Sequence, residues 1–182
     1  MAMMIPSVLS PEIRSAAERH VFKWFQTAQG AEDWIVLHSL GISNHRTRIY
    51  GETDFVVLAP GLGMFSLEVK GGRVRRENGI WSYTDRFNNV TQKTRGPFEQ
   101  AWEGIFSIVD ALKQRLDGTH SHLENLFFGI GVMFPDIKYE AVGIDEDPVQ
   151  VFDLDDGHDV VGFIHRISDG AKKKWIEHLV EV

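Results

Sequence analysis

The sequence predicts an α/β protein in which a mixed central β-sheet is flanked by α-helices. Three observations support this fold class. Apolar residues recur at helical spacing near the N-terminus and again in the second half of the chain. Between these stretches lie short β-rich runs joined by glycine-containing turns. A continuous apolar run at 126–134 then has the character of an internal strand that is buried on both faces.

The residues at the ends of each element predict where the helices and strands begin and end. A first helix is expected from Ser10, a capping residue followed by proline and an acid, to about Gly30. A second helix is expected over 97–117, from a proline in the first turn to a glycine terminator. A short strand at 149–152 and helical structure from about 158 complete the chain. The predicted order is therefore helix, antiparallel strands, helix, strand, strand, helix.

Composition narrows the class of protein. The 182 residues, of which 43% are hydrophobic, are expected to form one domain with one core. No stretch approaches the roughly 20 apolar residues of a membrane span, and the first ten residues do not resemble a secretory signal. The absence of cysteine excludes disulfides and thiolate metal sites. These features predict a cytoplasmic protein without a membrane partner.

The charge is unevenly distributed along the chain. The net charge is −7, which by itself argues against a nucleic-acid partner. Residues 70–95, however, contain seven basic and two acidic residues, whereas 96–182 contain seven basic and seventeen acidic residues. One end of the fold is therefore expected to attract a polyanion. The alternative is a solvated β-ribbon with a charged face, and charge alone does not separate the two.

The most informative segment is the pair of β-rich runs around the loop 59–63. If these strands pair around Gly61, residues that face each other have numbers that sum to 122, so Asp54 faces Glu68. Facing residues project from the same side of a hairpin. On that side the register gathers four charged residues, Glu52, Asp54, Glu68 and Lys70. The other side is nearly all apolar, with Thr53, Phe55, Val57, Ala59, Phe65, Leu67 and Val69.

The gathered charges suggest a metal site. Opposed carboxylates repel, and one lysine cannot neutralise three acids. A divalent cation can, and oxygen ligands at this spacing suit Mg²⁺ or Mn²⁺. Lys70 would then orient an attacking water or stabilise the developing negative charge. The alternative is an exposed hairpin in which Lys70 pairs with Glu52 or Asp54, and spacing alone leaves both open.

An acid on one strand and an acid-x-lysine on the next resembles the signature of the PD-(D/E)XK nuclease superfamily. The surrounding residues are more specific and resemble the NERD (nuclease-related) domain over about residues 10–135. This resemblance implies the superfamily's restriction-endonuclease-like core, a mixed sheet between helices with a metal site at one edge. It is carried by Ala17-Glu18-Arg19, the run 51–58, Leu67-Glu68-Val69-Lys70-Gly71-Gly72, Trp81 and the run 96–101.

The resemblance also implies individual roles. Three acids would form the metal site, a lysine would be catalytic, and a glutamine would stand on the helix after the core hairpins. Thr53 stands where the superfamily name has proline, a replacement common in NERD sequences. The residues with these implied roles are Glu18, Asp54, Glu68, Lys70 and Gln100.

The function implied is a Mg²⁺- or Mn²⁺-dependent deoxyribonuclease that hydrolyses phosphodiester bonds of single- or double-stranded DNA. The basic segment would supply non-specific phosphate contacts from Arg73, Arg75, Arg76, Lys93 and Arg95. One alternative is a non-catalytic nucleic-acid-binding module that positions a linked helicase, and another is a protein-interaction scaffold. The chain has no phosphate-loop motif, so a helicase would be a separate module of a larger protein. The sequence does not predict the oligomeric state.

Overall fold

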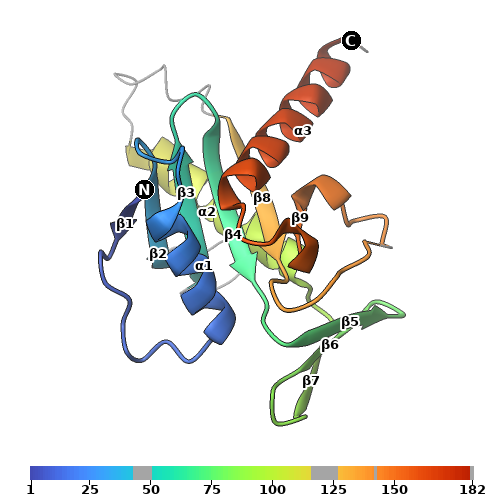
Figure 1. The fold of residues 1–182 in the computed structure, drawn as a ribbon. Coiled ribbons are helices and arrows are strands. Elements are labelled where there is room, and N and C mark those ends of the chain that lie inside the picture. The colour runs from blue at the N-terminus through green and yellow to red at the C-terminus, as the bar shows by residue number, and fades with distance from the viewer. Residues whose placement is uncertain (43–50, 116–126, 142, 181–182) are drawn as a thin grey trace.

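A six-stranded mixed sheet forms the centre of the computed structural model, which describes residues 1–42, 51–115, 127–141 and 143–180 (Figure 1). The predicted mixed sheet flanked by helices is thereby confirmed. In spatial order the strands of the central sheet are β1 (Met3–Ile5), β2 (Ile35–Ile42), β3 (Gly51–Ala59), β4 (Gly63–Val69), β8 (Phe128–Met133) and β9 (Val151–Phe152).

A separate three-stranded antiparallel sheet protrudes from the end of the molecule at which β4 finishes (Figure 1). We call this sheet the arm. Its first two strands are joined by Asn78 and Gly79, whose φ angles of 50° and 78° are those of a tight type I′ hairpin turn. The strands of the arm are β5 (Arg73–Glu77), β6 (Ile80–Thr84) and β7 (Val90–Lys93).

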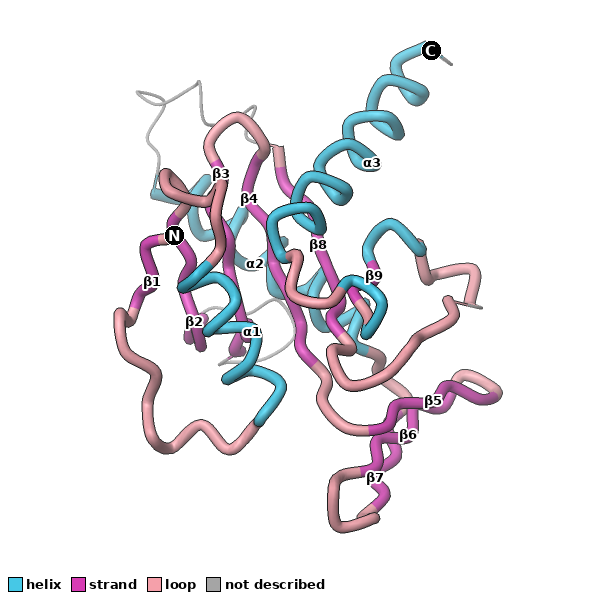
Figure 2. The backbone as a smooth tube through the Cα atoms, viewed as in Figure 1, coloured by secondary structure: helices cyan, strands magenta, loops and turns pink. Residues whose placement is uncertain are grey.

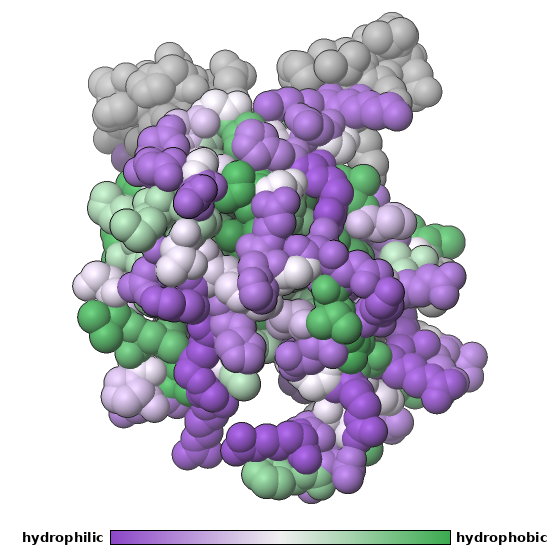
Figure 3. Space-filling view, viewed as in Figure 1, coloured by the Kyte–Doolittle hydropathy of each residue, from purple (hydrophilic) through white to green (hydrophobic). Residues whose placement is uncertain are grey.

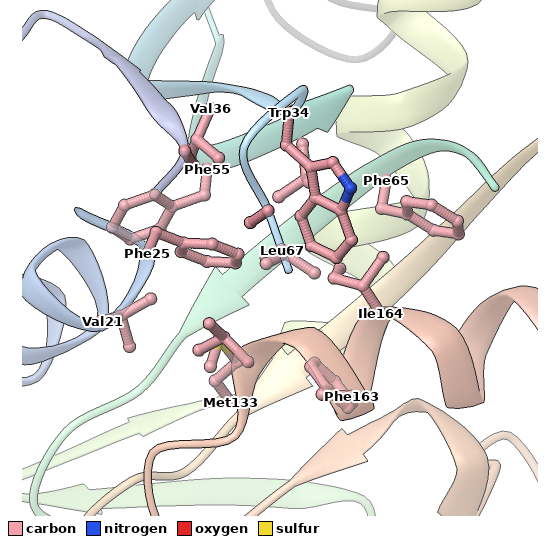
Figure 4. Packing of buried hydrophobic residues seen from close by; sticks show 14 of the residues in the cluster. Val21, Phe25, Trp34, Val36, Phe55, Phe65, Leu67, Met133, Phe163 and Ile164 are labelled. Atoms are coloured by element: carbon pink, nitrogen blue, oxygen red, sulfur yellow. The ribbon is translucent and has the colours of Figure 1, made fainter. Parts of the chain in front are cut away.

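Helices cover both faces of the central sheet. One face carries α1 (Ala16–Thr27) and α3 (Val160–Val180), and the other carries α2 (Pro97–Arg115), as Figure 2 also shows. The core under α1 and α3 joins helix residues such as Phe25 and Phe163 to strand residues such as Phe55 (Figure 4). No helix within the described ranges is both long and apolar enough to cross a membrane.

Strand pairing follows the expected hairpins and adds parallel neighbours. β3 pairs antiparallel with β2 and β4, while β1–β2, β4–β8 and β8–β9 pair in parallel. Parallel strands need a long crossover connection, and the arm together with α2 forms the connection between β4 and β8. β4 is thus an inner strand, buried over six of its seven residues.

Two element boundaries differ from expectation, and two short strands were not expected. The first helix begins at Ala16 because Ser15 caps it, whereas Ser10 closes only a turn with Glu12 and Ile13. The last short strand is reduced to two residues because Asp147 caps a 3-10 turn, η2 (Pro148–Gln150), immediately before it. Strands β1 and β7 were not predicted, since three or four residues are too few for a recognisable alternation.

Candidate active site

The β3–β4 hairpin has the expected register. Leu58 faces Met64 and Phe55 faces Leu67, so the numbers of facing residues sum to 122. The backbone ladder ends with that last pair, and Asp54 continues it through its side chain, because its Oδ2 accepts a hydrogen bond of 2.8 Å from the Val69 N–H. Asp54 therefore lies beside the segment that carries Glu68. The Glu52 side chain lies outside the described part of the structure.

On its other edge β3 is distorted at Asp54. The β2–β3 ladder runs through His38–Phe55 and resumes at Leu40–Thr53, but omits a Ser39–Asp54 pair. Ser39 has a φ of 52°, in the left-handed region. Asp54 therefore lies at a kink in β3. At this point the side chains of the strand no longer alternate regularly between the two faces of the sheet.

The kink also corrects one expected orientation. A Cβ atom added to Gly104 of α2 would lie 2.5 Å from the Thr53 Oγ1, so Thr53 faces α2. Phe55 instead packs in the core under α1 and α3. The expectation that Thr53 and Phe55 share a face is wrong, because the break at Asp54 inverts the alternation. The close contact also explains why a glycine stands in α2 at this point.

Glu68 and Lys70 form an ion pair at the end of β4. The Lys70 Nζ donates to the Glu68 Oε1, and the two side chains are 21% and 7% exposed. Lys70 is held further by its backbone N–H, which donates to the Met133 carbonyl at 2.9 Å. Pairing with β8 thus fixes the lysine beside the two acids.

Burial dominates the electrostatics of this cluster. It raises the pKa of Asp54 well above its usual range, and the negative charge of Glu68 raises it further. It also raises the pKa of Glu68, against the opposing effect of Lys70. Burial alone would lower the pKa of Lys70, but the charges of Glu68 and Asp54 raise it. The site therefore contains a buried Glu68, a partly buried Asp54 and one ammonium group held against Glu68.

Glu18 approaches this pair from α1. It occupies the third position of the helix, and its N–H donates to the capping Ser15 Oγ at 3.2 Å. Its charge raises the pKa of both Asp54 and Glu68, which places it within electrostatic reach of them. The Glu18 Oε2 lies 3.4 Å from the His38 Nε2.

His38 was not identified from the sequence. Its side chain is 2% exposed and lies between the rings of Phe22 and Phe55, with centroid distances of 5.6 and 4.7 Å. A histidine in an otherwise apolar run at 34–40 was the only available signal. Its partner on α1 is distant in sequence, so the Glu18–His38 contact could not be predicted.

Gln100 lies in the first turn of α2 and is partly buried. It precedes Gly104 by four residues, so the two share one helix face. Since Gly104 packs against Thr53 and Ser66, Gln100 is on the face of α2 that approaches β3 and β4. The expected proximity of this residue to the hairpin is consistent with that placement.

Two further residues belong to the surroundings of the acid pair. Arg95, expected as a phosphate contact, forms an ion pair with Glu103 of α2, and its charge lowers the pKa of Glu68. The pKa of Tyr83 on β6 is raised by burial and then by the charge of Glu68. Both residues come from segments that reach the site only through the fold.

The other basic residues that were predicted to contact phosphates lie on the arm. The visible surface of the arm is mostly hydrophilic (Figure 3). Arg73, Arg75 and Lys93 are exposed, with Arg73 donating to Asn88. Arg76 is different, because its guanidinium donates to Asp145 at 2.7 Å and to Glu146 at 2.6 Å.

Asp54 and Glu68 form a small set of potential metal ligands. Within residues 1–42, 51–115, 127–141 and 143–180, no group of three or more His, Asp or Glu side chains is arranged to hold a metal ion. Mg²⁺ is commonly bound by only one or two protein carboxylates, and its remaining ligands come from water and substrate. Asp54 and Glu68 could supply those two carboxylates. The desolvated, mutually repelling pair is a suitable donor set for such a cation.

The mixed sheet between helices is consistent with a nuclease-like domain, and Asp54 of β3 lies beside the acid-x-lysine segment at the end of the adjacent antiparallel strand β4. The nuclease-related domain family, NERD, matches residues 13–132, which are 120 of the 182 residues. The chain therefore belongs to the NERD family. The matched region includes all the residues discussed above from Glu18 to Arg95. No curated protein and no solved structure matches the chain.

Proposed function

We propose that the protein is a metal-dependent nuclease that hydrolyses phosphodiester bonds of DNA. The desolvated Asp54–Glu68 pair with Lys70 held against it is the observation that carries this proposal. A purely structural ion pair would not need a second, partly buried carboxylate beside it, which costs free energy unless it is compensated. Membership of the nuclease-related family supports the same chemistry.

Asp54 and Glu68 would hold a Mg²⁺ or Mn²⁺ ion, with Glu18 contributing through a bound water. PD-(D/E)XK nuclease-like domains usually depend on such a cation, which supplies positive charge to a phosphate oxygen and makes a coordinated water more acidic. The protein's own part is to orient the donors. The Val69 N–H fixes the Asp54 carboxylate, and Lys70 fixes that of Glu68.

Lys70 would act on the reacting groups themselves. Its ammonium group lies beside the carboxylates, in a position to orient the attacking water or to stabilise charge that develops on the phosphate. Burial strengthens this interaction because fewer water dipoles screen it. Gln100, on the helix face toward the hairpin, would contribute a polar contact on the same side.

The arm would bind the DNA backbone outside the reaction centre. Arg73, Arg75 and Lys93 are exposed and can reach phosphates, with Arg75 first leaving its surface ion pair with Glu77, whereas Arg76 and Arg95 are partly buried and engaged by acids. Such contacts are independent of sequence and weaken with salt, by a log–log slope of roughly −0.9 for each duplex phosphate neutralised. A non-catalytic module that positions a linked helicase would use the same arm, but would have no use for the buried acids.

Cleavage by the purified protein tests the proposal. Single- and double-stranded DNA are incubated with and without Mg²⁺ or Mn²⁺, and cleavage is expected only with the metal. Lys70→Ala should lower the rate by about 10²–10³-fold, the usual effect of removing one electrostatic contact to the transition state. Because the variant leaves the buried Glu68 without its partner, its stability should fall by about 3–5 kcal/mol, so the rates are compared under conditions in which both proteins are folded.

Lys93→Ala is the matched control, because Lys93 is an exposed lysine of the arm. This substitution should lower DNA affinity slightly and leave the rate at which bound DNA is cleaved unchanged. A Lys70→Ala protein that cleaves at the wild-type rate would refute the catalytic assignment.

A further inference from the structure

The turn between β6 and β7, residues 85–89, lies at the end of the arm where β5 begins. Arg73 at the start of β5 pairs with Thr84, so the turn begins beside the residues that directly follow Lys70, although it comes fifteen residues later in the sequence. Gly72 confirms the contact. It has a φ of 77°, and a Cβ atom at this position would lie 2.5 Å from the Thr84 carbonyl oxygen.

Hydrogen bonds hold this turn in one shape. The Asp85 Oδ1 accepts from the backbone N–H groups of Phe87 and Asn89, at 2.8 and 2.9 Å, and its Oδ2 accepts from the Asn89 side chain at 2.8 Å. Asn88 adopts a φ of 63° and accepts from Arg73. These hydrogen bonds hold the backbone of the turn, which is the loop between β6 and β7 in Figure 2, in one shape.

This turn carries an aromatic side chain. Phe87 is 70% exposed, and the Arg86 guanidinium lies 4.8 Å from the centroid of its ring. A rigid turn that holds an apolar ring in water gains nothing for the fold, since the ring buries little surface there. An aromatic face beside an arginine within a basic segment has the composition of sites that stack nucleic-acid bases.

We propose that Phe87 and Arg86 form a stacking platform for an unpaired base, which directs single-stranded segments of DNA to the acid pair. The inference rests on the proposed function for the chemistry at that pair, but the platform itself is a binding feature. Base stacking does not depend on sequence, because every base has a π-face. Intact duplex DNA is a poorer ligand, because its bases are already stacked and must be unstacked at a cost.

Binding without divalent metal tests the platform separately from cleavage. Affinities are measured for a single-stranded oligonucleotide and for its blunt duplex in EDTA, and a 2-aminopurine base in the single strand reports stacking by its fluorescence. Phe87→Ala should weaken single-strand binding by about fivefold to 150-fold, the effect of one base–aromatic stack. Duplex affinity should stay within twofold. Phe87→Trp should retain binding, whereas Phe87→Leu, which keeps apolar area without a π-face, should lose it.

Val90→Ala is the matched control, because Val90 is an exposed apolar residue of the same arm, and it should change neither affinity. Wild-type single-strand affinity in the Phe87→Ala variant would overturn the platform even if the wild-type protein cleaves DNA. Equal losses on single strand and duplex would also overturn it, as would a wild-type protein that does not bind single-stranded DNA. If binding depends on Phe87 but nothing is cleaved, the platform stands and the nuclease proposal fails.

Discussion

The protein contains two consecutive antiparallel hairpins that differ in their surroundings. β3–β4 lies inside the central sheet, where Val57, Phe65 and Leu67 are fully buried. β5–β6 belongs to the arm, where Val74 and Trp81 face inward while Arg73 and Arg75 face the solvent. The same local structure therefore serves as a core element in one case and as a surface element in the other.

Their charged residues show what the difference means. On β3–β4, burial raises the pKa of Asp54 and Glu68 because it penalises their charged forms, and a bound cation would offset that penalty. On β5–β6, Arg75 and Glu77 form an ion pair on the surface, where water screens the interaction. Burial rather than strand pairing makes one hairpin a candidate reaction centre and the other a candidate binding surface.

The largest effect is expected where the arm becomes part of the core. Trp81 is 2% exposed and packs against Phe98, Phe134 and Tyr139. Trp81→Ala should lower the free energy of unfolding, measured in urea, by about 3–5 kcal/mol. Ile80→Ala, one residue earlier on the exposed face, should cost no more than about 0.5 kcal/mol. Similar losses for both variants would contradict the inward docking of the arm.

A smaller effect is expected at Arg76, which joins the arm to Asp145 and Glu146. Arg76→Ala should cost about 1.5–3 kcal/mol, the range for hydrogen bonds to charged groups. The Arg76 hydrogen bond also lowers the pKa of Asp145. That contribution is present above the ordinary pKa of about 3.8 and is lost as the pH falls through the lower folded value. Below about pH 4, the free energy of unfolding should therefore fall less steeply with decreasing pH in Arg76→Ala than in the wild type. If the two proteins lose stability equally steeply in acid, the Arg76 hydrogen bond does not control the titration of Asp145.

Asp54→Asn is expected to raise the stability of the protein, whereas the two preceding variants lower it. Removing one of two neighbouring carboxylates should stabilise the metal-free protein by about 0.2–1 kcal/mol, while Mn²⁺ affinity, followed by calorimetry, should fall. The exposed Asp33→Asn serves as the control and should change neither quantity. Destabilisation of the metal-free protein by Asp54→Asn would show that the hydrogen bond from Val69 outweighs the repulsion.

The smallest effect on stability is expected at Arg75. Its exposed ion pair should contribute less than about 0.5 kcal/mol, so thermal unfolding of Arg75→Ala should match the wild type. Its effect should appear instead in duplex binding, where loss of one phosphate contact lowers the log–log salt slope by roughly 0.9. Lys113→Ala at the far end of α2 is the comparison variant. An identical slope for Arg75→Ala and wild type would remove Arg75 from the DNA interface.

Local patterns allowed much of this structure to be predicted. The register of β3–β4 followed from alternation and a glycine turn, and Asn78-Gly79 marked the second hairpin. The kink at Asp54 could not be predicted, because it depends on a left-handed Ser39 in the neighbouring strand. The contacts of Glu18 with His38 and of Arg76 with Glu146 likewise join segments that no local pattern relates.

The parallel pairing of β4 with β8 has a consequence for how the chain folds. Met64 pairs with Phe128, so the inner strand acquires its second neighbour from residues far along the chain. Until then the β3–β4 hairpin has an unpaired apolar edge, of the kind that promotes aggregation. Contacts of such sequence separation also slow folding. During synthesis from the N-terminus, Lys70 therefore acquires its backbone partner only once Met133 has been added.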